Sequence, residues 1–225
     1  SIDSWPYMFS NREEFERAYA SDAGQEWLAQ VEEETGFTLV ATMYKGLREI
    51  FLNKEAETLD DLNGVKLRVA SFQEQIDQFR CFGLAPTPMS TSEVYTAMSQ
   101  NVVEGMEIEL STAASMALQE VTETVMMTDH AAANYAILCY TEYFDSLPAE
   151  IQDAFVQAGN EAGTWLADQI ESADAEALQV FIDAGCEIVY PDTTSWQEIS
   201  FNEYASMYPE YAAIAQQLRD AAKGE

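Results

Sequence analysis

An arginine stands within a short apolar segment, where Arg68 follows Val65 and Leu67 and precedes Val69. Alternating apolar residues of this kind predict a β-strand that packs against a core. Arginine is almost never fully buried unless a partner offsets its charge. A planar guanidinium with paired N–H donors is well suited to hold a carboxylate. Arg68 therefore indicates either a bound anion or an internal ion pair with one of the chain's many acidic residues.

Residues that form most enzymatic sites are missing or isolated. His130 is the only histidine, so any Ser–His–Asp or Cys–His system, and any histidine-containing metal site, has to use it. A lone histidine between a loop and an apolar segment is more often structural or solvent-facing than catalytic. The sequence contains no GxSxG, HExxH, P-loop or GxGxxG pattern. We predict no enzymatic activity, no cofactor and no metal site.

The three cysteines, Cys81, Cys139 and Cys186, show neither CxxC nor metal-ligand spacing. Each stands among apolar neighbours, so we expect buried thiols that behave as small hydrophobic side chains. Whether two of them form a disulfide stays open.

The composition limits the class of protein. The chain has 225 residues, 48% of them hydrophobic, and can bury a sizeable core as one domain or two small lobes. No run reaches the ~18 apolar residues that span a bilayer, so we predict no direct membrane insertion. The first residues, SIDSWPYMF, lack a basic leader region. A secreted precursor loses its signal, so this does not argue for a cytoplasmic protein.

The formal net charge is −30, from 40 acidic and 10 basic residues. Such a charge disfavours nucleic acids and anionic membranes, because both are bound through Lys and Arg contacts to phosphate. A heavily solvated surface adapted to high salt explains the charge. An acidic face that docks a basic partner is the alternative.

The elements around Arg68 are expected to alternate between helix and strand. A capping box at Ser10 and Glu13 precedes helical spacing over 11–35, with a break near Gly24 and an end at Gly36. Further along, we expect two strands at 36–44 and 47–53, the Arg68 strand after the Asn63-Gly64 turn, a helix over 71–82, a helix from the Ser90–Glu93 capping box to 100, and a strand over 102–110. This order predicts a mostly parallel sheet covered by helices.

A single long helix is predicted in the second half of the chain. Residues 111–129 lack a clear pattern, and an apolar strand follows at 134–140. Apolar residues then recur without proline over 149–184, which predicts a helix of ~50 Å at 1.5 Å per residue. A short strand at 187–190 and two helices from about Ser195 and Glu210 complete the chain.

The block from Asp60 to Glu109 resembles the signature of the substrate-binding proteins of TRAP (tripartite ATP-independent periplasmic) transporters. It contains DLNGVKLRVAS, GLAPTPMSTSEVYTAM and NVVEGMEIE in order. The long helix is a second point of resemblance. The resemblance covers essentially the whole chain, but family members begin with a further strand–helix–strand portion that this chain lacks.

The resemblance implies an α/β fold: a two-lobed, periplasmic-binding-protein-like clamshell with a long helix spanning both lobes. It assigns 1–45 and 134–170 to lobe I and 46–133 to lobe II, with 171–225 forming the end of the long helix and C-terminal helices that pack across the lobes. It implies a periplasmic protein that captures a small organic acid anion and delivers it to TRAP permease membrane subunits.

The family's motifs also imply site residues. Arg68 matches the arginine that holds the ligand carboxylate. Arg48 matches a second, more variable arginine, unless it pairs with Glu49 or Glu55. Ser71 falls where a polar ligand-binding residue is common, unless it only caps the next helix.

Two departures from the family affect the expected pocket. Thr91 replaces an aromatic residue that often packs on the ligand, and Ile108 replaces an asparagine that often binds it. We therefore expect Met89, Thr91 and Ile108 to line a more apolar pocket, with Glu107 facing the ligand or paired to an arginine. A monocarboxylate with an apolar body is favoured over a C4-dicarboxylate.

Two other classes of protein remain open on the sequence alone. A sensory or interaction protein could use the same clamshell without transport, because fold and pocket would be shared. A small acidic periplasmic enzyme is disfavoured, because no nucleophile–base constellation is present.

Overall fold

The computed structural model describes residues 2 and 5–224. Its helices are α1 (Arg12–Ala20), α2 (Asp22–Thr35), α3 (Gln73–Cys81), α4 (Val94–Ser99), α5 (Leu110–Ser115), α6 (Thr141–Asp145), α7 (Ala149–Asp183), α8 (Thr194–Met207) and α9 (Ala212–Lys223). Short 3-10 turns are η2 (Leu59–Leu62), η3 (Thr91–Glu93) and η4 (Leu118–Glu120). The strands are β1 (Phe37–Leu52), β2 (Lys66–Val69), β3 (Ala85–Pro88), β4 (Gly105–Glu109), β5 (Thr124–Met126), β6 (Ala132–Tyr140) and β7 (Glu187–Val189).

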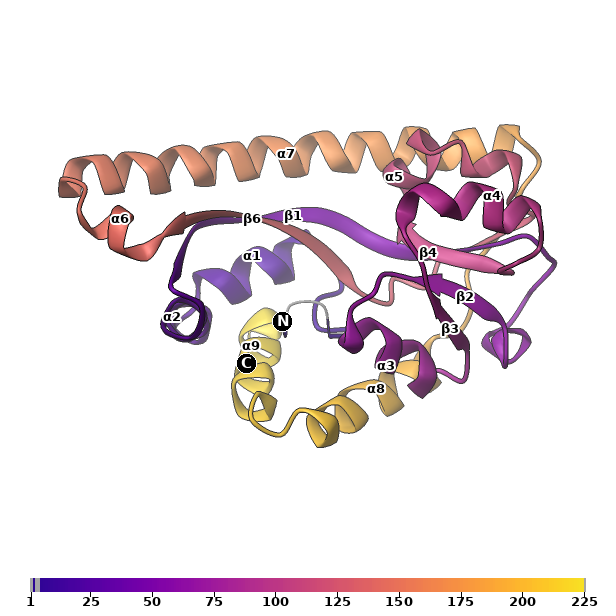
Figure 1. Ribbon diagram of the computed structural model, residues 1–225, viewed down its shortest axis with the longest axis horizontal. Helices are drawn as coiled ribbons and strands as arrows, with labels where there is room; N and C mark the ends of the chain where they lie inside the picture. Colours follow the sequence, from indigo (N-terminus) through magenta and orange to yellow (C-terminus); the bar gives the residue numbers. More distant parts are fainter. Residues whose placement is uncertain (1, 3–4, 225) are drawn as a thin grey trace.

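The strands form one seven-stranded sheet in the order β3-β2-β4-β1-β5-β7, with β6 paired to β1 outside this path. Strand β1 is antiparallel to β4, β5 and β6, whereas β2 is parallel to β3 and β4, and β5 to β7. The prediction of a mostly parallel sheet is therefore wrong. The reason is β1, which lies within the sheet and runs antiparallel to all three of the strands that it pairs with (Figure 1).

The two strands expected at 36–44 and 47–53 are one continuous strand, β1. Its register against β6 shifts between Leu39 and Ala41 and again between Tyr44 and Gly46. Gly46 has a φ of 106°, a conformation that favours glycine. Gly46 therefore marks a bulge within one strand, which begins near α2 and continues to the part of the sheet that contains β4 (Figure 1).

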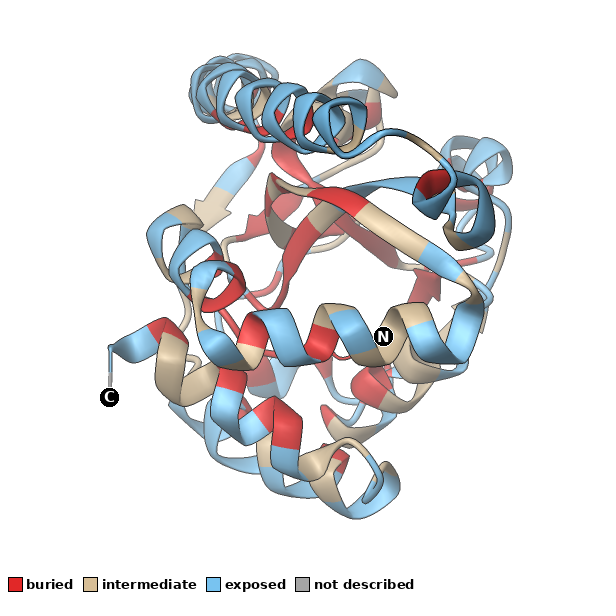
Figure 2. Cartoon of the chain, turned by 90° about the vertical axis from the view of Figure 1, so that its left-hand side faces the viewer, coloured by how far each residue is buried: buried red, intermediate tan, exposed pale blue. Residues whose placement is uncertain are grey.

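The long helix α7 has 35 residues and lies along the whole sheet (Figure 1), so the predicted helix over 149–184 is confirmed. Its outer face is largely exposed, while small residues on its inner face are buried over the strands (Figure 2). Gly159 and Gly163 allow this close approach, because a Cβ on Gly159 would stand 2.7 Å from the Ala41 side chain. Small residues thus set the distance between helix and sheet.

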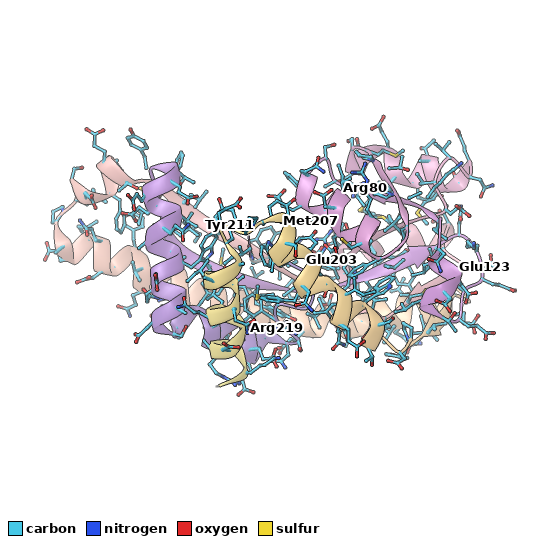
Figure 3. All side chains as sticks on the ribbon, turned by 90° about the horizontal axis from the view of Figure 1, so that it is seen from below. Arg80, Glu123, Glu203, Met207, Tyr211 and Arg219 are labelled. Carbon is cyan, nitrogen blue, oxygen red and sulfur yellow. The ribbon has the colours of Figure 1, made fainter. Side chains whose placement is uncertain are left out.

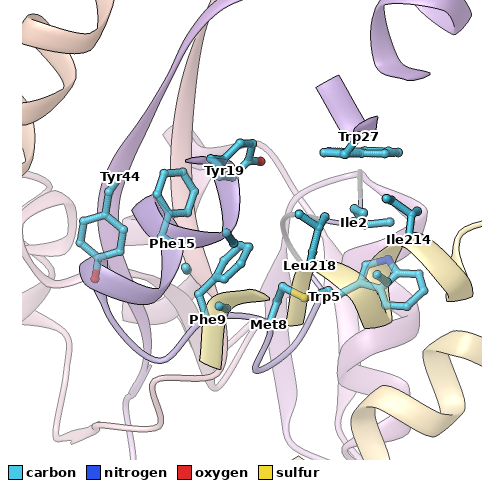
Figure 4. Close-up of a cluster of buried hydrophobic side chains, with 14 of the residues drawn as sticks. Ile2, Trp5, Met8, Phe9, Phe15, Tyr19, Trp27, Tyr44, Ile214 and Leu218 are labelled. Carbon is cyan, nitrogen blue, oxygen red and sulfur yellow. The ribbon is translucent and has the colours of Figure 1, made fainter. Parts of the chain in front are cut away.

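The core consists of three hydrophobic clusters. One joins the N-terminal segment, α1, α2, β1 and α9, and includes the buried rings of Trp5, Phe9 and Phe15 (Figure 4). The other two surround the sheet between β2 and β7 and include Phe51 and Phe79. The structure does not test the predicted division into lobes by residue range, which stays a prediction.

The C-terminal helices run along the underside of the molecule, where Glu203, Met207, Tyr211 and Arg219 mark their course (Figure 3). On the inner side of α8, the Tyr204 hydroxyl donates to the carbonyl oxygen of Glu74. The Tyr208 hydroxyl donates to Asp77 Oδ2 at 3.0 Å. Helix α8 therefore fixes the outer side of α3, as does the stacked ring pair Phe82–Trp196.

Several local expectations need correction at helix ends. Asn11 is the N-cap of α1, because its side chain accepts from the Glu14 N–H, and Ser10 lies one residue earlier. The break between α1 and α2 falls at Ser21 rather than near Gly24. The Ser90 capping box is present, but it opens the 3-10 turn η3 before α4 begins. The unpatterned stretch 111–129 contains most of α5, η4 and β5.

The three cysteines are free thiols. Only Cys186 is buried, whereas Cys81 and Cys139 are half-buried, so the expectation of three buried thiols is wrong for two of them. Cys139 lies on β6, whose residues 135–138 are exposed.

Candidate functional site

A cavity of about 570 Å³ opens where β6 begins beside β2 and α3. Its walls come from β1, the β2–α3 connection, the end of β4 and the segment 131–135. Three of the chain's ten lysines and arginines line it: Lys45, Arg48 and Arg68. A second cavity, of about 360 Å³, is lined by described residues that include no lysine, arginine or histidine. In a chain of charge −30, the first cavity is therefore the natural site for an anion.

Arg68 is only 3% exposed and lines this cavity. Its Nε and Nη2 donate to the carbonyl oxygen of Met89 at 3.0 and 2.8 Å, and Nη2 also donates to Thr91 Oγ1 at 2.9 Å. These neutral acceptors orient the guanidinium and leave Nη1 without a hydrogen-bond partner among the described residues. Neutral partners fix the group but do not neutralise it.

The charge of Arg68 has no close counter-ion in the described part of the chain, where no carboxylate oxygen lies within 4.0 Å of it. Burial lowers the pKa of Arg68, the more distant Glu107 opposes that shift, and the charge of Arg48 lowers the pKa further. A buried, fixed and unpaired guanidinium that faces a cavity is well suited to bind a carboxylate.

Arg48 differs from Arg68 in its partners. Its Nε and Nη2 donate to the two carboxylate oxygens of Glu107 at 2.6 and 2.9 Å, and Nη1 donates to Glu109 Oε1 at 2.7 Å. Lys45 Nζ contacts the second oxygen of Glu109 at 2.9 Å. Burial alone would lower the pKa of Arg48, but Glu107 and Glu109 outweigh burial and raise it. The two cations and two carboxylates neutralise one another.

Glu107 and His130 are both fully buried behind this ion-pair cluster. His130 Nε2 lies 3.4 Å from Glu107 Oε2, and its Nδ1 lies 2.8 Å from Thr128 Oγ1. Burial lowers the pKa of His130, with Glu107 opposing. Burial would raise the pKa of Glu107, but Arg48 and His130 lower it. His130 thus supports Glu107 as a structural group and does not reach the cavity lining.

The structure brings four of the seven predicted site residues to one cavity: Arg68, Arg48, Thr91 and Ile108. The alternative in which Arg48 pairs with Glu49 or Glu55 is wrong, because β1 pairs antiparallel with β4 and sets Arg48 opposite Glu109. Side chains alternate along a strand, so Glu49 points to the other face.

The other three predicted residues, Ser71, Met89 and Glu107, lie outside the lining. Ser71 is exposed and is not the cap of α3, since that position belongs to Phe72. Met89 contributes its carbonyl oxygen to Arg68 rather than its side chain to the cavity. Glu107 is the partner of an arginine, one of its two expected roles.

Sequence reasoning missed several lining residues, among them Lys45, Gln75, Gln78 and Tyr135. Lys45 lies 5.0 Å from the ring centroid of Tyr135, a cation–π contact between neighbouring strands. The i, i+3 spacing of Gln75 and Gln78 places both on one face of α3. For Gln75 and Gln78, this spacing is the one sequence signal that could have suggested a shared role.

Comparison with known proteins decides the family. The model of the bacterial extracellular solute-binding proteins, family 7 (DctP), matches residues 1–210. The chain belongs to this family. Its members are solute-binding proteins and not enzymes, so the prediction that the chain is not an enzyme is confirmed. Relatives named as periplasmic confirm the predicted location. None of the helices in the described residues is long and apolar enough to cross a membrane.

Two curated relatives carry names that state a ligand. The sialic acid-binding periplasmic protein SiaP of Vibrio cholerae is 28% identical over 193 residues, which is 86% of this chain and 60% of SiaP. The C4-dicarboxylate-binding periplasmic protein DctP of Rhodobacter capsulatus is 26% identical over 198 residues, or 86% of this chain and 59% of DctP. The chain thus spans about three fifths of the length of either relative.

The fold matches solved structures of the same type. A TRAP periplasmic solute-binding protein of Desulfovibrio salexigens, solved with bound orotic acid, has a TM-score of 0.87 and 26% identity. The match covers 100% of this chain and 73% of that protein. The predicted α/β clamshell fold and the predicted TRAP family are confirmed.

Proposed function

We propose that the protein captures an organic acid anion through Arg68 and delivers it to the membrane subunits of a TRAP permease. The supporting observation is the state of Arg68: buried, oriented by Met89 and Thr91, without a carboxylate within 4.0 Å in the described residues, and facing a cavity. A carboxylate would supply the missing charge and accept from the remaining N–H groups.

The ligands named for the relatives agree with a carboxylate. Sialic acid, C4-dicarboxylates and orotic acid differ in size and polarity, yet each carries at least one carboxylate. Arg48 and Lys45 are already neutralised by Glu107 and Glu109, which leaves Arg68 as the one unpaired cation among the described residues of the wall. That balance favours a monocarboxylate over a C4-dicarboxylate, in line with the apolar Ile108 in the lining.

Delivery to a permease rests on family membership. A sensory protein with the same clamshell would bind the ligand equally well, so binding alone does not separate the two functions. Reconstituting the protein with candidate permease subunits in vesicles distinguishes them. Ligand-dependent uptake supports transport, and binding without uptake supports the sensory alternative.

The carboxylate contact is tested with variants of the full-length protein. A thermal-shift screen of organic acids first selects a ligand, since a ligand at 100 times Kd stabilises a protein by ~2.7 kcal/mol. Arg68→Ala should then weaken binding by roughly 30-fold to several thousand-fold, because truncating a buried charge partner costs about 2–5 kcal/mol. Arg68→Lys should recover only part of the affinity, since lysine keeps the charge but lacks the planar fork.

Two controls accompany this titration calorimetry. Arg80→Ala removes an equal charge from an exposed position on α3. Arg80 lies 3.5 Å from Asp77 and does not line the cavity, so this variant should leave Kd unchanged. Arg48→Ala should cost less affinity than Arg68→Ala, although it removes the partner of two buried carboxylates. A cooperatively melting Arg68→Ala protein that binds within a few-fold of wild type contradicts the assignment of Arg68.

A further inference from the structure

Helix α3 forms one wall of the cavity, and its position is fixed from both sides. On the inner side, Gln75 Nε2 donates to Glu107 Oε1 at 2.7 Å, and Gln75 Oε1 accepts from the Ala70 N–H at 2.6 Å. On the outer side, the hydroxyl groups of Tyr204 and Tyr208 hold α3 against α8. Side chains on the inner face of α3 are therefore presented to the cavity from a rigid support.

Gln78 lies nearly one turn beyond Gln75 on this inner face and lines the same cavity. It is 3% exposed, and its Nε2 has no hydrogen-bond partner among the described residues. Six buried side-chain atoms in the described part of the chain lack a partner, and only this one belongs to a residue of the cavity lining. Leaving a buried polar group unpaired lowers stability, so such a group in a binding wall points to a ligand.

We propose that Gln78 is a second ligand anchor, whose side-chain amide hydrogen-bonds a polar group on the body of the acid held by Arg68. This inference rests on the proposed function and narrows its substrate class. The ligand is a carboxylate that carries a hydroxyl, carbonyl or similar group at a distance from the carboxylate. Acids with a wholly apolar body leave the amide unpaired and bind more weakly.

The surroundings of Gln78 explain why one amide can discriminate. The lining between the two anchors includes Ile108 and the alanines 131–133, which offer no side-chain hydrogen bond. Gln75 is already engaged with Glu107 and Ala70. Glu74, the third α3 residue of the lining, is a carboxylate that can only accept, so a ligand acceptor near α3 finds its hydrogen-bond donor in Gln78. The amide can also turn about its last bond, so it can serve a ligand acceptor or a ligand donor.

The first test needs no ligand. Gln78→Met keeps the size of the side chain and removes the unpaired amide, so it should raise the Tm of the ligand-free protein by about 2 °C or more. Gln73→Met, on the exposed face of the same helix, is the matched control and should leave Tm nearly unchanged. A lower Tm for Gln78→Met would show that the amide holds the fold together, and would overturn the proposal.

The second test measures selectivity by titration calorimetry with pairs of acids that differ in one oxygen. The probes are 4-hydroxybenzoate with benzoate, 4-hydroxybutyrate with butyrate, and 4-oxopentanoate with pentanoate. In at least one pair, wild type and Gln73→Met should prefer the oxygenated acid by on the order of 10- to 100-fold. Gln78→Met should reduce that preference to within about 2-fold while keeping its affinity for the apolar partner.

The outcomes separate this proposal from the one on which it rests. Equal binding of both members in every pair, with loss of binding in Arg68→Ala, overturns the role of Gln78 and leaves the carboxylate site intact. An unchanged preference in Gln78→Met likewise overturns it. Wild-type protein that binds neither these six acids nor any acid of the thermal-shift screen overturns both proposals.

Discussion

Arg68 and Arg48 show that the same side chain takes opposite roles according to what its charge faces. Arg48 lies opposite Glu109 in the β1–β4 register and is neutralised by two buried carboxylates. Arg68 is held by a carbonyl and a hydroxyl, which orient it without neutralising it. Breaking the first arrangement leaves the buried Glu107 carboxylate without its arginine, and breaking the second removes a binding group. We therefore expect loss of Arg48 mainly to lower stability and loss of Arg68 mainly to weaken ligand binding.

Glu49 is a buried carboxylate of another kind. It is 2% exposed, and its Oε2 accepts from the N–H groups of Thr128 and Asp129 at 2.6 and 3.0 Å. Burial raises the pKa of Glu49 well above its usual value, and the charge of Asp129 raises it further. The segment that Glu49 holds links β5 to β6, and Asp129 within it has a φ of 48°. Glu49 thus fixes a strained connection beside the cavity.

We predict that Glu49→Gln stabilises the protein at neutral pH and not at pH 4. The folded pKa of Glu49 stands above the unfolded value of about 4.3, so its ionisation destabilises the fold increasingly as pH rises through this window. Below both values the acid is protonated in both states and the penalty vanishes. The stabilisation should reach about 1.4 kcal/mol for each unit of elevation, because glutamine still accepts from the two N–H groups.

Thermal melts of the wild type and of Glu49→Gln from pH 4 to 8 test whether the stabilisation grows with pH. Glu107 has the opposite sign: its pKa is lowered to about 2, so its contribution to stability is lost as pH falls from about 4.3. Glu107 is present in both proteins and cancels in the comparison. A stability difference that does not grow with pH contradicts the assignment to Glu49.

The residues that sequence could predict were those with a local signal. Arg68 interrupts a short apolar strand, and four residues of context suffice to single it out. The partners of Arg48 stand 59 and 61 positions away, and only the β1–β4 register reveals them. Gln78 is an ordinary helix residue in the sequence, and only the folded structure shows that it is buried and lines the cavity. Its role depends on tertiary packing, which a single sequence does not display.

At the scale of elements, helix α7 packs closely against strand β1. Gly159 and Gly163 lie four residues apart on one face of α7, above Ala41 and Met43 of β1. Glycine in a helix interior is normally unfavourable by about 1 kcal/mol relative to alanine. Its presence at both positions indicates that close packing outweighs helix propensity.

We predict that Gly159→Ala destabilises the protein and that Gly163→Ala does not. The new Cβ at position 159 would stand 2.7 Å from Ala41 Cβ, which cannot move without shifting the strand. Overpacking costs about 1–3 kcal/mol and exceeds the gain in helix propensity. At position 163 the nearest atom is Met43 Cγ at 3.1 Å, on a side chain that can turn aside. Urea unfolding of the two variants is the measurement, and equal stabilities would contradict it.

The elements could be predicted where a hydrophobic repeat extends over many residues, as in α7. Prediction failed for the bounds of β1 and for the short strand β5. The apolar repeat without proline indicated α7 over its whole length. The sequence predicts two strands at 36–44 and 47–53, yet they form the single strand β1 with a bulge at Gly46, because β6 pairs on both sides of this glycine. The strand β5 has three residues, too few for an alternating pattern to be recognised. The antiparallel pairings of β1 depend on how the chain returns through the sheet, which the order of elements left undetermined.

At the scale of the whole molecule, the acidic surface opposes the compact state. The formal net charge is −30, and the long outer face of α7 carries several exposed carboxylates. Basic residues, by contrast, gather in part at the cavity. Repulsion among exposed charges acts over about a Debye length, which shrinks from ~10 Å in 0.1 M salt to ~3 Å in 1 M salt. The same negative potential repels an anionic ligand from most of the surface, so the cavity wall with its basic residues is the more favourable place for an anion.

We predict that Tm rises by several degrees between low salt and 1 M NaCl, because screening relieves self-repulsion more in the compact state than in the expanded chain. The triple variant Glu161→Gln, Glu176→Gln and Asp183→Asn removes three exposed charges from α7 and should melt higher in low salt, with a smaller salt response. Differential scanning calorimetry of both proteins over a NaCl series provides the comparison. Sucrose, which strengthens burial without screening charge, should raise both Tm values equally. A Tm that stays flat or falls with added salt, or a variant that responds to salt as strongly as wild type, would show that surface charge does not limit the stability of this fold.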